Sequence, residues 1–351
     1  MLVRTDRLGD VILTLPMLPP LRSCFPDAFI AMLLNRYTGE IVEGNPYADE
    51  LLWYDDGREL IPFREMLQTV RAKSFDAVII VHPTPRLAWL MFRSGISLRI
   101  GTGYRYYSFL FNRKVYEHRK DAKRHELEYN LNLLHQLDCP LPQSQWRPEF
   151  YIDIPMETQH YIEGLLQSFG VDLKNKIVII HPGSGGSARE WPLENFGMLA
   201  GKLTKERNVQ IIVTGSEGEK AQVEEVVKCT QGNAIALAGK LRLKELAALI
   251  RSASLFVSNS TGPLHIAVAV GTPVVGLYPQ ITAMGPQRWG PYTDVKRVLV
   301  PEMAVDCTEC SGNKGELCAC MASITVEQVY EAGCSLLANN NIHAAGMMIH
   351  E

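Results

Sequence analysis

The 351-residue sequence lacks three features that would each indicate a compartment or a partner. No apolar run is long enough to cross a membrane, because Gly and Pro shorten or interrupt every one. The net charge is only −3, so no overall positive charge indicates nucleic acid as a partner. The start carries no secretory signal, since early acids and three prolines interrupt it: Pro16, Pro19 and Pro20. What remains is the composition of a globular protein, with 46% hydrophobic and 21% charged residues.

The eight cysteines fall into two groups. Four are scattered in apolar surroundings and are predicted to be reduced thiols in or near the core of a cytosolic protein: Cys24, Cys139, Cys229 and Cys334. The other four are clustered: Cys307, Cys310, Cys318 and Cys320. A structural zinc site is one interpretation, but the second pair is too tightly spaced for a zinc ribbon and no histidine lies close by. We favour a reduced structural cluster, with an adventitious metal or a disulfide as alternatives.

Short apolar segments alternate with helical patterns in both halves of the chain, which predicts parallel sheets and an α/β fold. The predicted strands are Leu2–Thr5, Phe29–Leu34, Ala77–Val81, Ile177–Ile180, Val209–Thr214, Ala234–Leu237, Leu255–Val257 and Val274–Tyr278. The predicted helices are Asp10–Arg22, Ile61–Lys73, Glu126–Leu137, Pro192–Glu206, Glu219–Cys229, Lys244–Ser252 and Gly262–Val270. The first strand follows Met1 directly, which favours a natural start a few residues upstream.

A linker with Pro140, Pro142 and Pro148 separates the two halves. We therefore predict two doubly wound, Rossmann-like domains facing a central cleft, residues 1–150 and 151–330, with a helix end and tail at 331–351. In open sheets of this kind ligands bind at the carboxyl ends of the strands.

Two loops in the second half have the composition of anion sites. Ser258 to His265 places small hydroxyl residues and a glycine between a strand and a helix, and His181 to Ser187 follows another strand. Backbone N–H groups of such loops hold anions at helix N-termini. Two of them in one domain predict a bound diphosphate, and hence a nucleotide-linked substrate.

Asp10 lies at the first strand-to-helix turn, within Arg7-Leu8-Gly9-Asp10. An acid that stabilises the helix N-terminus is one interpretation. A general base directed into the inter-domain cleft is the other. The residues of this turn alone leave both open.

An ordered set of motifs resembles glycosyltransferase family 9, the heptosyltransferases of lipopolysaccharide core synthesis. The set runs from the first residues to about Val329, and its members are Arg7-Leu-Gly-Asp10-Val-Ile-Leu-Thr-Leu-Pro16, Asn45-Pro46, His125-Glu-Leu-Glu-Tyr-Asn130, His181-Pro-Gly-Ser-Gly-Gly186, Trp191-Pro-Leu-Glu-Asn-Phe196 and Ser260-Thr-Gly-Pro-Leu-His265. The resemblance implies a GT-B fold and an inverting transfer that uses no metal or other cofactor. It implies ADP-heptose as the donor, a lipid A acceptor bearing Kdo or heptose, and Asp10 as the base.

The resemblance and the two loops together predict which residues bind the donor. The diphosphate residues are Ser184, Arg189, Ser260, Thr261, Gly262 and His265, and Glu217 is predicted to bind the nucleoside. Four of these residues have a plainer alternative: a solvated arginine for Arg189, a helix N-cap for Thr261, a core histidine for His265 and a helix N-terminal acid for Glu217. Many family members carry an acid where this chain has Ser260, so contacts to the sugar are least defined there.

Residues 99–124 are basic and rich in aromatics. The resemblance assigns the anionic, lipid-linked acceptor to this region, and the predicted contacts are Arg105, Arg113, Lys114, Arg119 and Arg124. A solvated loop or a nucleic-acid site are the alternatives, but no nucleic-acid motif accompanies the segment. We therefore expect a cytoplasmic monomer, peripheral on the inner face of the inner membrane. Other functions left open are transfer from another nucleotide sugar, a UDP-sugar epimerase of the same fold, and a non-catalytic nucleotide-binding assembly protein.

Overall fold

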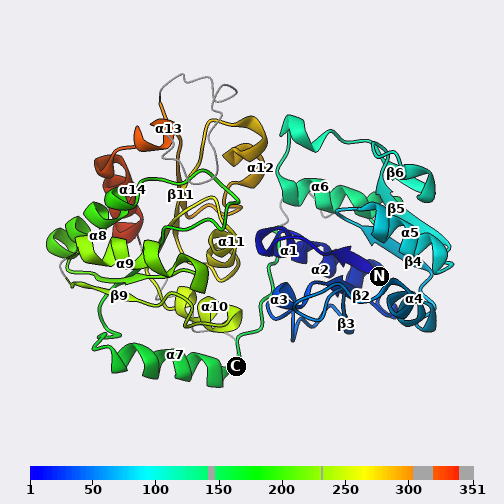
Figure 1. Ribbon diagram of the computed structural model, residues 1–351, viewed down its shortest axis with the longest axis horizontal. Helices are drawn as coiled ribbons and strands as arrows, with labels where there is room; N and C mark the ends of the chain where they lie inside the picture. Colours follow the sequence, from blue (N-terminus) through cyan, green and yellow to red (C-terminus); the bar gives the residue numbers. More distant parts are fainter. Residues whose placement is uncertain (141–146, 231, 303–318, 340–351) are drawn as a thin grey trace. The chain divides into compact units, whose positions relative to one another are not determined.

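The chain forms two compact units, Met1–Asp153 (unit 1) and Ile154–Glu351 (unit 2), and the division lies close to the predicted boundary after residue 150. The computed structural model describes residues 1–140, 147–230, 232–302 and 319–339. Each unit is built on a six-stranded sheet with helices around it (Figure 1). Every strand pair in both sheets is parallel, which confirms the predicted α/β class with two doubly wound units.

Unit 1 has its first strand in the middle of the sheet, in the order β3-β2-β1-β4-β5-β6. The central strands are buried on both faces, as a parallel sheet covered by helices requires. The strands are β1 (Leu2–Arg4), β2 (Ala31–Leu34), β3 (Glu50–Trp53), β4 (Ala77–Ile80), β5 (Leu98–Thr102) and β6 (Arg113–Val115).

Short helices connect these strands. They are α1 (Leu8–Ile12), η1 (Leu15–Met17), α2 (Leu18–Cys24), α3 (Arg36–Gly39), α4 (Phe63–Ala72), α5 (Pro85–Arg93), η2 (Ser108–Leu110), η3 (Arg119–Asp121), α6 (Glu126–Asn132) and η4 (Leu133–Leu137). The single helix predicted over residues 10–22 is wrong, because three successive short helices occupy that region. Pro16, Pro19 and Pro20 cannot donate the backbone hydrogen bonds that one continuous helix needs.

Unit 2 repeats the design with the order β12-β11-β10-β7-β8-β9. Its strands are β7 (Ile177–His181), β8 (Gln210–Val213), β9 (Ala234–Ala236), β10 (Leu255–Asn259), β11 (Val274–Leu277) and β12 (Lys296–Leu299). Its helices are α7 (Met156–Ser168), α8 (Leu193–Arg207), η5 (Glu217–Glu219), α9 (Lys220–Cys229), α10 (Leu243–Arg251), α11 (Gly262–Ala269), η6 (Thr282–Met284), α12 (Pro286–Trp289), α13 (Ala319–Ala322) and α14 (Val326–Asn339). Helix α14 contributes Leu336 and Leu337 to the core of this unit.

Each sheet has a switch point where the chain reverses the direction in which strands are added. In unit 1 it lies between β1 and β4, and in unit 2 between β7 and β10. Ligands of doubly wound sheets bind outside the carboxyl ends of the strands at such points. The loop before Asp10 follows β1, and the two predicted anion loops follow β7 and β10, so the candidate residues lie where the topology favours binding.

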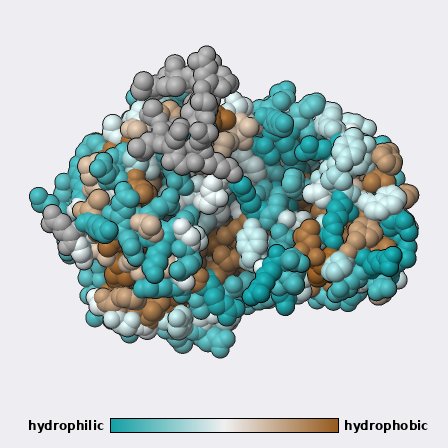
Figure 2. Space-filling view, in the orientation of Figure 1, coloured by the Kyte–Doolittle hydropathy of each residue, from teal (hydrophilic) through white to brown (hydrophobic). Residues whose placement is uncertain are grey.

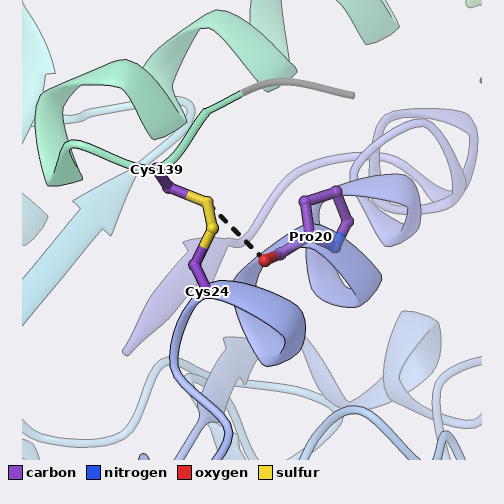
Figure 3. Close-up of a disulfide and its surroundings, with 3 residues drawn as sticks. All are labelled: Pro20, Cys24 and Cys139. Carbon is purple, nitrogen blue, oxygen red and sulfur yellow. Dashed lines mark hydrogen bonds between the residues drawn. A yellow bond between two sulfur atoms is a disulfide. The ribbon is translucent and has the colours of Figure 1, made fainter. Parts of the chain in front are cut away.

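Cys24 and Cys139 form a disulfide, so the prediction that these two thiols are reduced is wrong (Figure 3). The end of α2 lies against the segment after η4, which brings two residues 115 positions apart to a Cα–Cα distance of 5.9 Å. The Cys139 sulfur also lies 3.6 Å from the Pro20 carbonyl oxygen, a contact rather than a hydrogen bond because a disulfide sulfur carries no proton. Of the clustered cysteines, the side chain of Cys320 is buried in unit 2, and Cys307, Cys310 and Cys318 lie outside the described residues.

Much of the surface in view is hydrophilic, with apolar residues scattered across it (Figure 2). Among the described residues, no helix combines the length and the apolar character needed to cross a bilayer.

Candidate functional site

Charged side chains meet at the switch point of unit 1. Arg4, the last residue of β1, is buried and donates to two carboxylates: Nε to Asp6 Oδ1 at 2.7 Å, and Nη2 to Asp10 Oδ1. Asp10 lies in the first turn of α1, and His82 after β4 places its Nδ1 3.3 Å from Asp6 Oδ2. Two strand ends and one helix N-terminus thus contribute to one set of interactions around Asp10.

Helix α6 and the η3 turn complete this set. Glu126 Oε1 lies 3.5 Å from Arg4 Nη1 and accepts a 2.5 Å hydrogen bond from Arg119 Nη1. The same Arg119 nitrogen donates to Asn130 Oδ1 at 2.9 Å, and Asn130 Nδ2 donates to the Leu13 carbonyl at 3.0 Å. Glu126 and Asn130 stand one helical turn apart and therefore face the same side of α6. We call these residues the Asp10 network: Arg4, Asp6, Asp10, His82, Arg119, Glu126 and Asn130.

The network shifts the proton affinity of Asp10. Burial raises its pKa from the usual 3.8 to about 6; Arg4 opposes the rise, and the like charges of Asp6 and Glu126 add to it. Burial alone would lower the pKa of Arg4, but the three carboxylates hold it above its ordinary value, so the guanidinium stays charged. An aspartate with a pKa near 6 is largely ionised at pH 7 and is a better proton acceptor than an exposed one. A helix N-terminal acid alone does not explain this shift.

The network also includes His82 and borders Arg105. Burial lowers the pKa of His82, Asp6 raises it and Arg4 and Arg105 lower it further, so the net shift favours the neutral imidazole. Tyr37 donates its hydroxyl to the Asp6 carbonyl at 3.1 Å, and burial with the nearby Asp6 and Asp10 charges raises its pKa. Side chains from β1, α3, α6 and the segment after β4 therefore present titratable or charged groups to Asp10 or to one of its neighbours.

The predicted acceptor residues differ in exposure. Arg105 and Arg113 are exposed and Lys114 is half-buried, as a binding surface requires. Arg124 is exposed and lies 3.5 Å from Glu117. Arg119 is instead held inside unit 1 by Glu126 and Asn130, with its guanidinium over the Tyr129 ring. The structure therefore gives Arg119 a supporting position in the Asp10 network, and its contact with acceptor stays a prediction.

The loop after β7 is shaped by two glycines and one carboxylate. Gly185 and Gly186 have positive φ angles of 54° and 71°, which side chains tolerate poorly. Glu219 of η5 accepts a 3.0 Å hydrogen bond from the Gly185 N–H and a 2.8 Å bond from the Ser216 N–H. A Cβ at Gly183 would lie 2.1 Å from Glu219 Oε1, so a larger residue there would require the Glu219 carboxylate to move.

Glu219 also lies near His181 at the end of β7. Burial tends to raise the pKa of Glu219, but hydrogen bonds from Ser216 and Gly185 and the nearby His181 lower it overall. Burial lowers the pKa of His181, whose Nδ1 lies 3.0 Å from the Thr214 hydroxyl. The Glu219 carboxylate and the buried His181 thus lie together at the base of this loop.

Asn259, the last residue of β10, ties the two loops of unit 2 together. Its Nδ2 donates to the Pro182 carbonyl at 2.6 Å, and its Oδ1 accepts from the Trp191 N–H at 3.0 Å. Trp191 is buried, and its indole N–H donates to the Ile324 carbonyl at 2.8 Å. The segment that carries Arg189 is therefore anchored at both ends.

Thr261 immediately precedes α11. Its side chain makes no N-cap hydrogen bond, so the N-cap interpretation is wrong for the hydroxyl, although Thr261 occupies the N-cap position. The hydroxyl is buried and has no hydrogen-bond partner within the described parts of the chain. The first N–H groups of any helix also lack partners inside the helix. An anion oxygen at this helix end would satisfy both kinds of group.

The other predicted donor residues lie at the carboxyl end of the same sheet. Ser184 already donates to Glu190 at 2.6 Å, Arg189 is half-buried, and His265 is buried in α11. Ser260 forms a backbone bond with Leu277, and its side chain hydrogen-bonds the buried Tyr278. Glu217 is exposed, and its carboxylate lies over Gly239 after β9. Their ligand contacts stay predictions, and the hydroxyl of Ser184 has a protein partner instead.

Several residues of the two sites are absent from the sequence-based predictions. The sequence pattern indicates only strand or turn positions for Arg4, Asp6 and His82, and the start of a helix for Glu219. The feature of the sequence that could have identified them as site residues is their position directly at the ends of strands next to a switch point. Glu126 and Asn130 were visible as a pair at helical spacing inside a motif, but nothing in the sequence linked them to Asp10.

Comparison with known proteins places these sites in context. The family described as "Glycosyltransferase family 9 (heptosyltransferase)" matches residues 63–315 of this chain, a range that begins after Asp10. Lipopolysaccharide heptosyltransferase 3 of Escherichia coli K12 is 29% identical over 305 residues, which cover 82% of this chain and 83% of that protein.

Two solved structures share the fold. A family 9 glycosyl transferase from Veillonella parvula matches with a TM-score of 0.83 and 26% identity over 96% of both chains. The ADP-heptose lipopolysaccharide heptosyltransferase II of Escherichia coli matches with a TM-score of 0.79 and 21% identity, over 97% of this chain and 98% of that one.

Proposed function

The chain belongs to glycosyltransferase family 9, and we propose that it transfers heptose from ADP-heptose to the inner core of lipopolysaccharide. Its fold is GT-B, and it is a transferase. The proposed reaction inverts the anomeric carbon and uses no metal ion. We further propose that the chain acts as a monomer at the cytoplasmic face of the inner membrane. The names of its relatives support heptose and lipopolysaccharide as the substrate classes.

The observation that carries the proposal is the environment of Asp10. Its carboxylate is held by Arg4 and has a pKa of about 6, so it can accept a proton near neutral pH. In the proposed step an acceptor hydroxyl gives its proton to Asp10 while its oxygen bonds to the anomeric carbon of the donor. The bond between that carbon and the diphosphate oxygen breaks on the opposite face, and ADP leaves with the electron pair.

The leaving diphosphate gains negative charge that must be stabilised. The N–H groups at the start of α11 and the Thr261 hydroxyl are proposed to donate to it, with Arg189 supplying positive charge. Gly185 and Gly186 allow the loop after β7 to approach the phosphates closely. Asp10 lies on unit 1 and these groups lie on unit 2, so the proposal requires both units to act on one pair of substrates.

The test is Asp10→Asn, with Glu65→Gln as a control that removes an exposed acid from α4. We expect Asp10→Asn to lower kcat by roughly 10²- to 10⁴-fold, because general-base assistance is lost. ADP affinity, measured by calorimetry, should stay within about twofold, since Asp10 is not a donor ligand. Turnover by Asp10→Asn within tenfold of the wild type would refute the role of Asp10.

The donor is tested by thermal stabilisation with ADP-, GDP- and UDP-sugars, because the true ligand raises the stability of the folded state. Incubation with a donor alone tests the epimerase alternative, since an epimerase needs no acceptor. Initial rates in the presence of EDTA test the metal-free part of the proposal; a rate that falls and returns with added Mg²⁺ would contradict it.

A further inference from the structure

One stretch of unit 1 differs sharply from the rest of the chain in its charge. The 40 residues from Ala77 to Tyr116 contain no Asp or Glu. They contain six cations, at Arg86, Arg93, Arg99, Arg105, Arg113 and Lys114. The chain as a whole has 38 acids and 35 Lys and Arg, so this stretch is a local reversal of the overall balance.

The same stretch exposes large aromatic side chains on helix α5. Leu87, Leu90 and Met91 of this helix are buried in the core, whereas Trp89 and Phe92 are each 43% exposed. These two rings stack with their centroids 5.7 Å apart, and the Arg93 guanidinium lies over Trp89 at 5.5 Å. Helix α5 therefore presents an aromatic and cationic face to solvent.

The turn around η2 adds two more exposed rings. Tyr107 and Leu110 are buried, and the Tyr107 hydroxyl donates to the Pro83 carbonyl at 2.5 Å. This anchoring leaves Tyr106 82% exposed and Phe109 73% exposed. Because these two rings bury little surface within unit 1, they contribute little to the stability of its fold.

Arg99 connects the helix and the turn. Its guanidinium lies 5.4 Å from the Phe92 ring on α5, and its Nε donates to the Leu110 carbonyl of η2 at 2.8 Å. Arg71 of α4 also donates to the Arg93 carbonyl at 2.7 Å, which adds a cation beside this face. In Figure 2 the region around α5 and β6 shows apolar residues mixed with hydrophilic ones.

We propose that this face of unit 1 docks on an anionic lipid bilayer, through a surface made of Trp89, Phe92, Arg93, Tyr106 and Phe109, here called the aromatic surface. Trp89 and Tyr106 have rings with one polar group and favour the level of the lipid headgroups, and Phe92 and Phe109 add apolar surface that can enter the interface. Cations beside them attract anionic headgroups, and no acid within the stretch opposes that attraction. The charge complementarity is what selects an anionic bilayer over a neutral one.

This inference rests on the proposed function only in the activity assay, which uses an acceptor, because lipid binding can be measured without catalysis. The direct test is co-sedimentation of the full chain with phosphatidylcholine vesicles, with and without about 30% phosphatidylglycerol, in about 0.05 M and 0.5 M salt. We expect binding to the anionic vesicles in low salt, weak binding to neutral vesicles, and weakening by salt.

The variants are two double substitutions, Trp89→Ser with Phe92→Ser, and Tyr106→Ser with Phe109→Ser. Each should lower the partition coefficient by about tenfold, because apolar surface that enters the interface is lost. Arg93→Ser should lower it by about fivefold, the effect of one cation near an anionic surface. The control is Tyr161→Ser in unit 2, an aromatic that is 51% exposed and lies outside the surface; it should bind as the wild type does.

An activity assay separates docking from catalysis. With a deacylated, water-soluble acceptor the Trp89→Ser, Phe92→Ser variant, which lies outside the predicted acceptor region, should keep the wild-type rate, and with acceptor embedded in vesicles it should lose rate in proportion to binding. Loss of rate on the soluble acceptor would overturn the proposal, because the aromatic surface would then serve the acceptor itself. Equal binding to neutral and anionic vesicles, or no vesicle binding with retention of an oligonucleotide, would also overturn it.

If neither acceptor is turned over by the wild type but anionic vesicles bind and the variants weaken binding, the proposed function fails and the docking surface stands. If transfer occurs and vesicle binding is absent, the docking surface fails and the proposed function stands. The two inferences are therefore separable in one set of experiments.

Discussion

Replacing Asp6 with Asn should lower the pKa of Asp10 without dismantling its surroundings. Asp6 and Asp10 both bind the Arg4 guanidinium, and Asp6 also faces His82. Asn keeps an oxygen that can accept the hydrogen bond from Arg4 Nε, and it removes one negative charge next to Asp10. Asp6 is one of the two like charges that raise the pKa of Asp10, so removing its charge should lower that pKa.

The size of the shift follows from the geometry. Two carboxylates bound to one guanidinium lie on the order of 6 Å apart, and at an effective dielectric constant of about 20 to 40 their repulsion is roughly 1.5 to 3 kcal/mol. Since 1.36 kcal/mol corresponds to one pKa unit, the expected fall is roughly one to two units. Asp10 would then titrate near pH 4 to 5 instead of about 6.

The assay is the pH dependence of kcat/KM, whose acid limb reports the pKa of the base in the free enzyme. Asp10 must be ionised to accept a proton, so activity falls as the pH drops through its pKa. A lower pKa moves the acid limb of Asp6→Asn to lower pH, whereas Glu65→Gln should leave the limb in place. The carboxyl carbon resonance of labelled Asp10 gives the same pKa without catalysis.

An acid limb that stays near pH 6 in Asp6→Asn, or that moves to higher pH, would refute the electrostatic account. If the Asp10 resonance shifts as expected and the limb does not, the assigned pKa is right and the base is another group. Replacing Glu126 would also test the direction of the Asp10 pKa shift, but less cleanly, because Glu126 also pairs with the half-buried Arg119.

Two further predictions concern unit 2 and the disulfide. Thr261→Val removes a buried hydroxyl that has no hydrogen-bond partner among the described residues, so it should raise the melting temperature of the free protein slightly. The same change should weaken ADP binding by roughly tenfold in calorimetry, and unchanged ADP affinity would exclude Thr261 as a phosphate ligand. Reduction of Cys24–Cys139 should lower the free energy of unfolding of unit 1 by about 2 to 4 kcal/mol in a urea titration; equal midpoints for the oxidised and reduced forms would contradict this.

The sequence predicts local structure well where one segment carries the whole signal. The strands Ala77–Ile80 and Ile177–His181 are apolar runs bounded by turn residues, and their positions agree with the predictions to within a residue or so. The break of the first predicted helix was also visible in principle, because Pro16, Pro19 and Pro20 lie in it.

The sequence predicts partners poorly where the signal is divided between distant segments. Asp10 is a candidate from the sequence alone, but its raised pKa comes mainly from burial, with a further contribution from Glu126 on another helix far along the chain. Arg4 looked like an ordinary strand residue, although burial beside three carboxylates makes it the centre of the network. The disulfide could not be predicted for the same reason. The apolar surroundings of a cysteine in the sequence do not show which other cysteine lies close to it in the fold.

The disulfide would not be expected to persist at the proposed cytoplasmic site of action, because most cytosolic cysteines are kept reduced. Hydrogen bonds around the Asp10 network would hold Asp10 in place even when this disulfide is reduced. Cys24 and Cys139 join α2 to the segment after η4, whereas Asn130 of α6 bonds the segment between α1 and η1 through the Leu13 carbonyl and the Thr14 hydroxyl. Thr14 in turn donates to the Asp10 carbonyl at 2.8 Å. These bonds do not depend on the sulfur oxidation state, so the reduced enzyme should be less stable but should hold Asp10 in the same place and turn over at the oxidised rate.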